Sequence, residues 1–395
     1  MDFNFDEIFD RRKGNARKWS SEVLNQKFGI KDSDAIAMDL ADIDFPVAKP
    51  IQQALTIRAS IPDYSYTYTS SEFYEAVKKW NKNNFQCDFK KEWIILTYGT
   101  VSTLHNIVQC FTEVGDKIMF HTPAYDPFCE AVDNNCRVPV FSSLVEKDGR
   151  YEMDFSRMEQ DMKDNDVKVF ILCNPQNPSG RVWTREELFL LNELCIKYDI
   201  ILVSDEIHRE YVFEGYTFTS MWEFSKTNEN LIMCFSPNKA FNLGGLKTSY
   251  VVTRNEHLLE KFSKQLKRNQ ITSPNVFAIP AIVAAYDECG EWLREMVAYV
   301  EKNHHYLSKF IEQEMPLFKV MKPESSFLAW INVDELLKTD GQKDLFFQNC
   351  HISVVKGSYF VRDGNKFIRL SIGMPRKVLA EALFRIKKEY DKWIK

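Results

Sequence analysis

Short apolar segments alternate with amphipathic segments through the middle of the chain, and few folds accommodate that alternation. The apolar segments have the length of buried strands and cover residues 93–97, 117–120, 167–173, 200–203 and 231–235. Helical periodicity lies between them, at residues 102–111 and 186–197, and Thr184 with Glu187 matches a capping box that opens the second helix. The pattern predicts βαβ units, and therefore an α/β fold with a mainly parallel sheet covered by helices on both faces.

The pattern changes after about residue 276. Long helices are expected at 276–289 and 291–313, then short strands at 327–331, 352–355 and 367–371, and a closing helix from Arg376 onward. The chain has 395 residues, enough for two domains, and no Pro/Gly-rich linker separates the two patterns. We therefore expect a second, smaller α+β domain packed tightly against the first.

The charge balance argues against a nucleic-acid partner. The 51 Lys and Arg residues face 56 Asp and Glu residues, so the formal net charge is -5 and no global positive field attracts phosphate polymers. The basic cluster near the N-terminus is short, and we interpret it as a solvated or subunit-contacting arm; it comprises Arg11, Arg12, Lys13, Arg17 and Lys18.

The hydropathy and cysteine patterns argue against a membrane, a disulfide framework and a metal. No apolar run approaches the roughly 20 residues that cross a bilayer, and the first residues are acidic, so we expect a cytoplasmic protein. The nine cysteines contain no Cys-x-x-Cys pair, and the adjacent His304 and His305 point in different directions on a helix. We expect reduced thiols and no metal site.

Polar residues follow several of the predicted strands, at the edge where parallel sheets bind ligands. Residues 174–180 (Asn-Pro-Gln-Asn-Pro-Ser-Gly) form a turn-rich loop, and Asp205 follows a buried strand. Residues 236–246 place Lys239 in a Ser-x-x-Lys loop, and residues 98–101 open a helix. Singly, each has a structural explanation as a turn, a helix cap or a solvated lysine. Together they indicate a catalytic site.

These residues resemble those of the fold type I pyridoxal-phosphate (PLP) enzymes, the class I/II aminotransferase superfamily. Residues 9–12 with Lys18 and Trp19, and residues 41–46, 204–208 and 236–243, resemble its MalY/PatB-type cystathionine β-lyase branch, which includes cystalysin-like C–S lyases. The resemblance implies a large domain with a mainly parallel seven-stranded sheet between helices. We expect this PLP-binding domain at residues 46–285, the small domain at 286–395, and an N-terminal arm, residues 1–45, that packs with the small domain.

The resemblance implies the roles of four residues around the cofactor ring. Lys239 matches the lysine whose amine holds the PLP aldehyde and, once freed by the substrate, moves the Cα proton. Asp205 matches the carboxylate that keeps the pyridine nitrogen protonated, and Asn177 the donor to the ring's phenolic oxygen. His208 occupies a position that holds His in this branch, where it supports the cofactor or packs behind it.

The PLP phosphate needs backbone N–H groups at a helix N-terminus together with hydroxyls or cations. Gly99, Thr100 and Val101 match the helix start, and Ser236 supplies a hydroxyl. Lys247 stands where many relatives have a phosphate-binding arginine, so it binds phosphate or faces solvent.

The resemblance also implies residues around the substrate. Tyr66 matches a tyrosine that reaches the phosphate of the neighbouring subunit and takes part in catalysis, which implies a homodimer with shared active sites. Tyr125 matches the aromatic residue that stacks on the ring, or packs in the core. Arg369 matches the arginine that binds the substrate α-carboxylate, with Asn177 beside it. Asp126 departs from the branch, which has Tyr or Pro there.

The branch favours a carbon–sulfur β-lyase that cleaves L-cystathionine or related cysteine S-conjugates to a thiol, pyruvate and ammonia. An aminotransferase is the alternative, because the same Cα deprotonation leads to either outcome. A regulatory binding protein is a third reading, since some members of the branch also contact a transcription factor. The departures, such as Asp126, surround the substrate, and the motifs leave its identity open.

Overall fold

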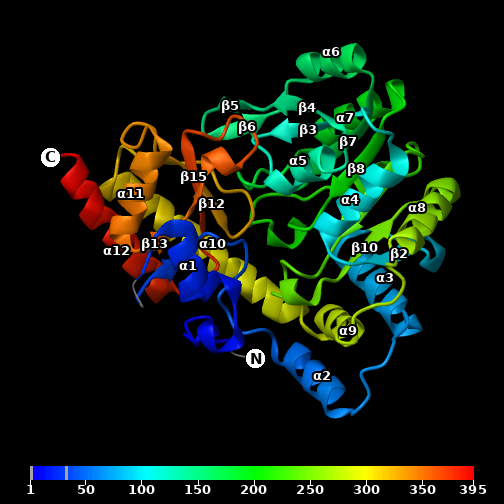
Figure 1. Cartoon of the computed structure of the whole chain (residues 1–395), viewed down its shortest axis with the longest axis horizontal. Coiled ribbons are helices and arrows are strands. Elements are labelled where there is room, and N and C mark those ends of the chain that lie inside the picture. The colour runs from blue at the N-terminus through cyan, green and yellow to red at the C-terminus, as the bar shows by residue number, and fades with distance from the viewer. Residues whose placement is uncertain (1–2, 32–33) are drawn as a thin grey trace.

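The computed structural model describes residues 3–31 and 34–395, and its centre is a seven-stranded sheet (Figure 1). In spatial order the strands are β2 (Ile94–Thr97), β10 (Ser249–Val252), β9 (Leu231–Phe235), β8 (Ile201–Asp205), β7 (Val167–Cys173), β3 (Lys117–Thr122) and β4 (Val138–Ser143). Only β10 is reversed within this sheet, so it pairs antiparallel with β2 and β9. The predicted α/β fold with a mainly parallel seven-stranded sheet is confirmed.

Helices cover both faces of this sheet because successive strand residues point to opposite sides. Val169 and Ile171 pack in one apolar cluster with α4 (Thr100–Phe111), α5 (Asp126–Asp133) and α8 (Glu256–Arg268). Phe170 and Leu172 pack in another cluster on the other face. The helices of that cluster are α3 (Ser71–Phe85), α6 (Phe155–Asn165), α7 (Arg185–Lys197) and α9 (Ala278–Glu288). Helix α7 begins at the predicted capping box of Thr184 and Glu187.

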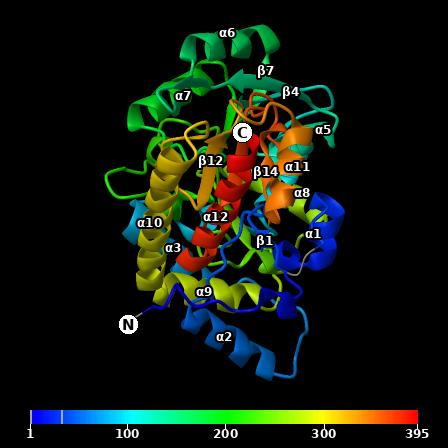
Figure 2. The same cartoon turned by 90° about the vertical axis from the view of Figure 1, so that its left-hand side faces the viewer.

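A smaller sheet forms from the C-terminal part of the chain. Its order is β11 (Lys319–Val320), β12 (Leu328–Asn332), β15 (Phe367–Ser371) and β14 (Val355–Lys356), all antiparallel. The helices α10 (Gly290–Glu314), α11 (Asp340–Cys350) and α12 (Arg376–Trp393) lie around it, and Figure 2 shows α10 beside α12.

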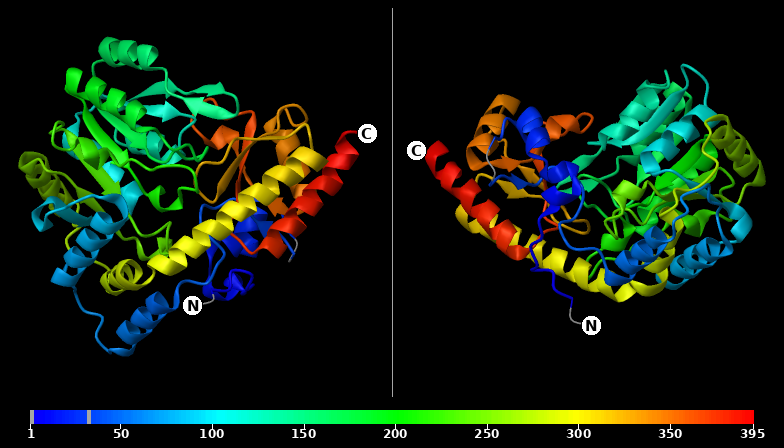
Figure 3. Two further views of the ribbon diagram at one scale, coloured as in Figure 1. Left: turned by 180° about the vertical axis from the view of Figure 1, so that it is seen from behind. Right: turned by 60° about the horizontal axis from the view of Figure 1, so that its bottom comes forward.

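Helix α10 joins the two parts of the molecule. Its N-terminal half contributes Trp292 and Met296 to the apolar cluster of the large sheet, and its C-terminal half contributes Leu307 and Ile311 to the cluster of the small sheet. Figure 3 shows the helix extending from one part to the other. Residue 285 lies within α9, and the division into domains at 45/46 and 285/286 stays a prediction.

The N-terminal segment contacts the C-terminal part of the chain before the first strand of the large sheet begins. After α1 (Ser21–Phe28), β1 (Ile36–Ala37) pairs in parallel with β13 (Ile352–Ser353), and the Ser371 N–H donates to the Met38 carbonyl at 2.7 Å. Helix α2 (Lys49–Ser60) follows, and the hairpin β5 (Val145–Lys147) and β6 (Arg150–Glu152) lies beyond β4. Residues from opposite ends of the sequence therefore lie side by side.

Candidate active site

The C-terminal ends of β7, β8 and β9 meet at one edge of the large sheet. Cys173 of β7 pairs with Asp205 of β8, which pairs in turn with Cys234 of β9. The loops that follow these strands carry Asn177, His208 and Lys239. The strand-end residues singled out in the sequence thus share one edge.

Lys239 lies between this edge and the N-terminal segment. Its Nζ donates to the Ala41 carbonyl at 2.6 Å, and its own carbonyl accepts from the Tyr211 hydroxyl at 2.8 Å. Burial lowers the pKa of the Lys239 amine to about 8, against the attraction of the Asp42 and Asp205 carboxylates. An amine with this pKa is more often neutral near neutral pH than an ordinary lysine, as a nucleophile or base must be.

Asp205 is a buried carboxyl group at the end of β8. The Ile207 N–H donates to its Oδ1 at 3.3 Å, and none of the described cationic side chains forms a salt bridge with it. Burial raises the pKa of Asp205 to about 7. A cationic N–H beside it would restore the charged form, which is the environment that the predicted role of Asp205 requires.

His208 is buried, and its Nδ1 is without a hydrogen-bond partner among the described residues. Burial lowers its pKa to about 3, with further contributions from the positive charges of Lys239 and Arg369. The imidazole is therefore neutral at physiological pH and keeps one buried polar atom available.

Arg369, in β15, extends toward the loop that carries Asn177. Its Nη1 donates to Asn177 Oδ1 at 3.0 Å and its Nη2 to the Asp39 carbonyl at 3.1 Å, while Nε has no partner among the described atoms. The residue is only 4% exposed, and burial lowers its pKa to about 10. A buried guanidinium that, among the described residues, hydrogen-bonds to neutral oxygens alone is suited to an incoming carboxylate.

The start of α4 offers uncapped backbone N–H groups, because Gly99 at the N-cap has no side chain to accept from them, and Thr100 and Val101 begin the helix. A Cβ atom on Gly99 would lie 4.0 Å from Lys247 Cα and Cδ, so Lys247 lies against this helix start. Ser236, which precedes Lys239 by three residues, is buried, and its hydroxyl donates to the Thr248 carbonyl at 2.6 Å. The helix dipole and Lys247 favour an anion here.

Tyr125 is half-buried immediately before α5, and burial raises its pKa, with Arg369 and Asp205 among the charges that act on it. Asp126 is the first residue of α5 and is exposed. Burial, with Glu130 and Asp133 nearby, raises the pKa of Asp126. The charges of Arg369 and Asp205 that act on Tyr125 place it near the predicted site, whereas Asp126 is exposed.

Tyr66 lies apart from these residues, on the segment between α2 and α3, and is 98% exposed. Its exposed neighbours Tyr64 and Tyr68 are also aromatic, and two exposed isoleucines lie nearby in the chain, Ile57 in α2 and Ile61 directly after it. Within its own chain, Tyr66 does not complete the site. Its predicted contact with a neighbouring subunit stays a prediction.

The interpretation of the N-terminal basic cluster as a solvated or subunit-contacting arm is wrong for two of its members. Lys18 is only 1% exposed, and its Nζ lies 2.8 Å from Asp44 Oδ2 and 3.3 Å from Asp42 Oδ1. The Arg11 guanidinium lies 2.9 Å from Asp42 and also binds Asp44. Local charge patterning could not distinguish solvated from paired cations, because the partners follow 24 or more residues later.

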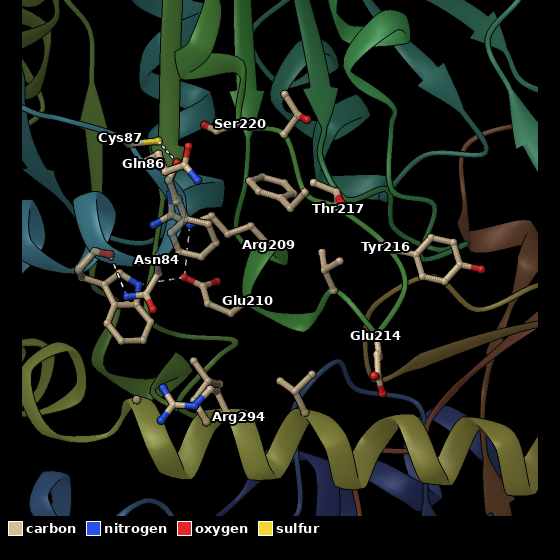
Figure 4. A pocket seen from close by; sticks show the side chains of 18 of the residues that line it. Asn84, Gln86, Cys87, Arg209, Glu210, Glu214, Tyr216, Thr217, Ser220 and Arg294 are labelled. Carbon is tan, nitrogen blue, oxygen red and sulfur yellow. Dashed lines mark hydrogen bonds and ion pairs between the residues drawn. The ribbon is translucent and has the colours of Figure 1, made fainter.

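A cavity of about 1030 Å³ lies between the end of α3, residues 209–223 and α10 (Figure 4). Arg209 and Glu210 line it, with Cys87 and Arg294, and Lys239, Asn177 and Arg369 do not. The Arg209 guanidinium carbon lies 4.0 Å from the Phe85 ring centre and 4.1 Å from that of Phe235. The cavity is therefore separate from the strand-end site, and Arg209 anchors the chain that follows His208.

The strand-end residues fit PLP group by group. Asp205 matches the ring nitrogen, the Lys239 amine matches the aldehyde, and the start of α4 with Lys247 matches the phosphate. Arg369 is left for a substrate carboxylate. Each of these groups of the cofactor and substrate thus has a chemically suitable residue at the strand ends, and the individual roles stay predictions.

Comparisons with known proteins agree with this chemistry. The sequence matches the family described as aminotransferase class I and II over residues 39–386. It is 35% identical to cystathionine beta-lyase PatB of Bacillus subtilis (strain 168), over 97% of this chain and 99% of that protein. It is 26% identical to protein MalY of Escherichia coli (strain K12), over 96% and 97% of the two chains.

Solved structures give the same relationship. The PLP-bound putative aminotransferase from Clostridium difficile 630 has a TM-score of 0.94 at 34% identity, over 98% of this chain and 100% of that chain. Cystalysin from Treponema denticola, which contains a pyridoxal 5′-phosphate cofactor, has a TM-score of 0.95 at 29% identity, over 99% and 100% of the two chains. The chain therefore belongs to the aminotransferase class I and II family, as its motifs predicted.

Proposed function

We propose that this protein is a PLP-dependent carbon–sulfur β-lyase that cleaves L-cystathionine or related cysteine S-conjugates to a thiol, pyruvate and ammonia. The observation that carries the chemistry is that two buried groups lie at one edge of the large sheet: the Asp205 carboxyl, which has no salt bridge among the described residues, and the Lys239 amine, whose pKa is lowered. The choice of a lyase is supported by the similarity to PatB over nearly the whole of both chains.

Each residue contributes a defined step. Bound PLP supplies an electron sink that acidifies the substrate Cα–H bond. Arg369 binds the α-carboxylate and so orients that bond, and Asn177 holds the Arg369 guanidinium in place. The Lys239 amine accepts the Cα proton, and Asp205 keeps a positive charge on the ring nitrogen. The Cβ–S bond then breaks with its electron pair on sulfur, and the leaving thiolate takes up the proton that Lys239 removed and becomes the thiol. Water hydrolyses the remaining three-carbon enamine to pyruvate and ammonia.

The product assay tests the reaction. Purified protein is incubated with L-cystathionine, and separately with an amino acid and 2-oxoglutarate; Lys239→Ala is the control. Equal amounts of thiol and pyruvate from cystathionine support the lyase. Amino-group exchange without pyruvate release would contradict it and favour an aminotransferase, the activity named for the C. difficile neighbour.

We also propose that the protein is a homodimer whose sites share Tyr66, and that it works in the cytoplasm. The exposed aromatic segment around Tyr66 supports the dimer. In the parts of the chain that the structure describes, no helix is long and apolar enough to span a membrane. Mixing Tyr66→Ala chains with Lys239→Ala chains tests the sharing, because a hybrid dimer regains one intact site. If dimers form and activity does not return, Tyr66 acts within its own subunit or not at all.

A further inference from the structure

Four charged side chains form a buried network beside Lys239, which we call the N-terminal charge network: Arg11, Lys18, Asp42 and Asp44. Lys18 Nζ bridges both carboxylates, Arg11 binds both from the other side, and the Trp19 indole N–H donates to Asp44 at 2.8 Å. Two positive and two negative charges balance, as burial requires. The roles assigned to the reaction so far use none of them.

The network holds the backbone that contacts Lys239. Lys18 Nζ donates to the Asp42 carbonyl at 3.1 Å, and the preceding carbonyl, that of Ala41, accepts from Lys239 Nζ. The next carbonyl, that of Ile43, accepts from Asn242 in the Lys239 loop at 3.0 Å. The segment 41–43 is thus clamped between the network and the lysine loop.

The same network reaches the strand that carries the substrate arginine. Ser371, two residues after Arg369 in β15, has its Oγ 3.4 Å from Lys18 Nζ and 3.1 Å from the Asp42 carbonyl. One buried ammonium group therefore contacts the segment beside Lys239 and the strand of Arg369. The position of the Lys18 ammonium group therefore fixes Lys239 and Arg369 relative to one another.

We propose that Arg11, Lys18, Asp42 and Asp44 are positioning residues of the reaction, which hold the Lys239 nitrogen in place and set its proton affinity from the N-terminal segment. This proposal rests on the proposed role of Lys239 as the cofactor-binding amine. It gives a role to the sequence motifs of Arg11 and Lys18–Trp19, which the chemistry of the strand-end residues does not explain.

The charges around Lys239 predict in which direction each member of the network changes its proton affinity. Lys18 and Arg11 keep Asp42 ionised, with a lowered pKa despite its burial. Asp42 in turn favours the protonated form of Lys239, together with Asp205, while Arg369 and Lys247 oppose it and His208 is neutral. Removing an anion leaves the network with a net positive charge, and removing a cation leaves it with a net negative charge. The two changes must therefore shift the proton affinity of Lys239 in opposite directions.

The test is the pH titration of the near-visible absorption of the holoenzyme, whose cofactor is joined to the Lys239 nitrogen. Asp42→Asn, which is isosteric, is expected to move the midpoint to lower pH. Lys18→Met is expected to move it to higher pH, and the double variant to lie between them. Lys343→Met is the matched control, because Lys343 is an equally buried lysine of α11 that contacts Asn365 and Asp340. Its midpoint is expected to equal that of the parent.

A purely structural network would destabilise the protein without opposite shifts. Midpoints that stay fixed, or that move the same way in both single variants, would overturn the proposal. Should Lys18→Met not fold, Arg11→Met makes the same charge change at a less buried position. For a folded variant that retains no cofactor, the pH dependence of Lys239 acetylation by acetic anhydride is measured instead of the absorption. A parent protein with no reducible near-visible band would instead refute the proposed function.

Discussion

Replacing Arg369 by Met should separate substrate binding from stability. The lost contact with a substrate carboxylate is charge-assisted, and such contacts contribute about 2–4 kcal/mol in total. That range corresponds to a decrease in kcat/KM of roughly 30- to 1000-fold. Because Arg369 binds a group that does not react, we expect most of the loss in KM.

The free energy of unfolding should respond differently, because no carboxylate in the described part of the chain forms a salt bridge with the Arg369 guanidinium. Burial lowers the pKa of Arg369 from its ordinary value to about 10, so at every pH below about 10 the charged form costs the folded state ~3 kcal/mol. Removing the charge recovers this cost. It also removes the bonds to Asn177 and Asp39, at about 1 kcal/mol each. The two effects nearly offset, and the free energy of unfolding should change by only about 1 kcal/mol.

Arg181→Met is the matched control. Arg181 is equally buried, but it binds the carboxylates of Glu187 and Glu324 at 2.7 and 3.1 Å. Breaking these pairs should cost about 3–5 kcal/mol. Steady-state kinetics on S-benzyl-L-cysteine and its methyl ester, with urea unfolding of each variant, provide the comparison. The reasoning is refuted if Arg369→Met unfolds as readily as Arg181→Met, or if it loses as much activity on the ester as on the free acid.

Three further outcomes are expected. Lys239→Ala should abolish turnover with little change in unfolding midpoint, and peptide mapping of the parent protein after borohydride reduction should find the cofactor at position 239; near-normal turnover of the variant would contradict the role of Lys239. Asp205 has a raised folded-state pKa, of about 7, so the cofactor-free protein should lose up to ~4 kcal/mol from this group as the pH rises from about 4 to 7. Asp205→Asn should remove that loss in urea titrations across this range, and identical pH dependences would refute the assignment. Gly364→Ala should cost ~1–3 kcal/mol or more, because its Cβ would lie 2.2 Å from the Gly357 carbonyl oxygen, whereas Gly341→Ala, with open space around it, should be nearly neutral.

The strand-end chemistry could be predicted because it follows from local sequence and a general rule of parallel sheets. Asp205 lies at the end of an apolar segment, and the rule places such ends at one edge, where the structure has them. The capping box at Thr184 could also be predicted from the sequence, because its two partners are three residues apart.

The N-terminal charge network could not be predicted in the same way. Arg11 and Lys18 find their partners through the packing of residues 41–44 against β15, which local periodicity does not encode. The reversed strand β10 has only four residues and follows a glycine-containing loop. Its direction in the sheet depends on its pairing with β2 and β9, which local periodicity does not encode. Tyr66 is exposed, and its role depends on a second chain.

The contact between Lys18 and Ser371 spans 353 positions of the sequence. Together with the pairing of β1 and β13, it means that the reaction centre is enclosed only when both extremities of the polypeptide have come together. During synthesis, a chain that ends before β15 would carry Lys239 and Asp205 without the arginine or the serine that Lys18 contacts. Catalytic competence should therefore arise late, after the large sheet has formed, and a premature stop near the C-terminus should yield a folded core without turnover.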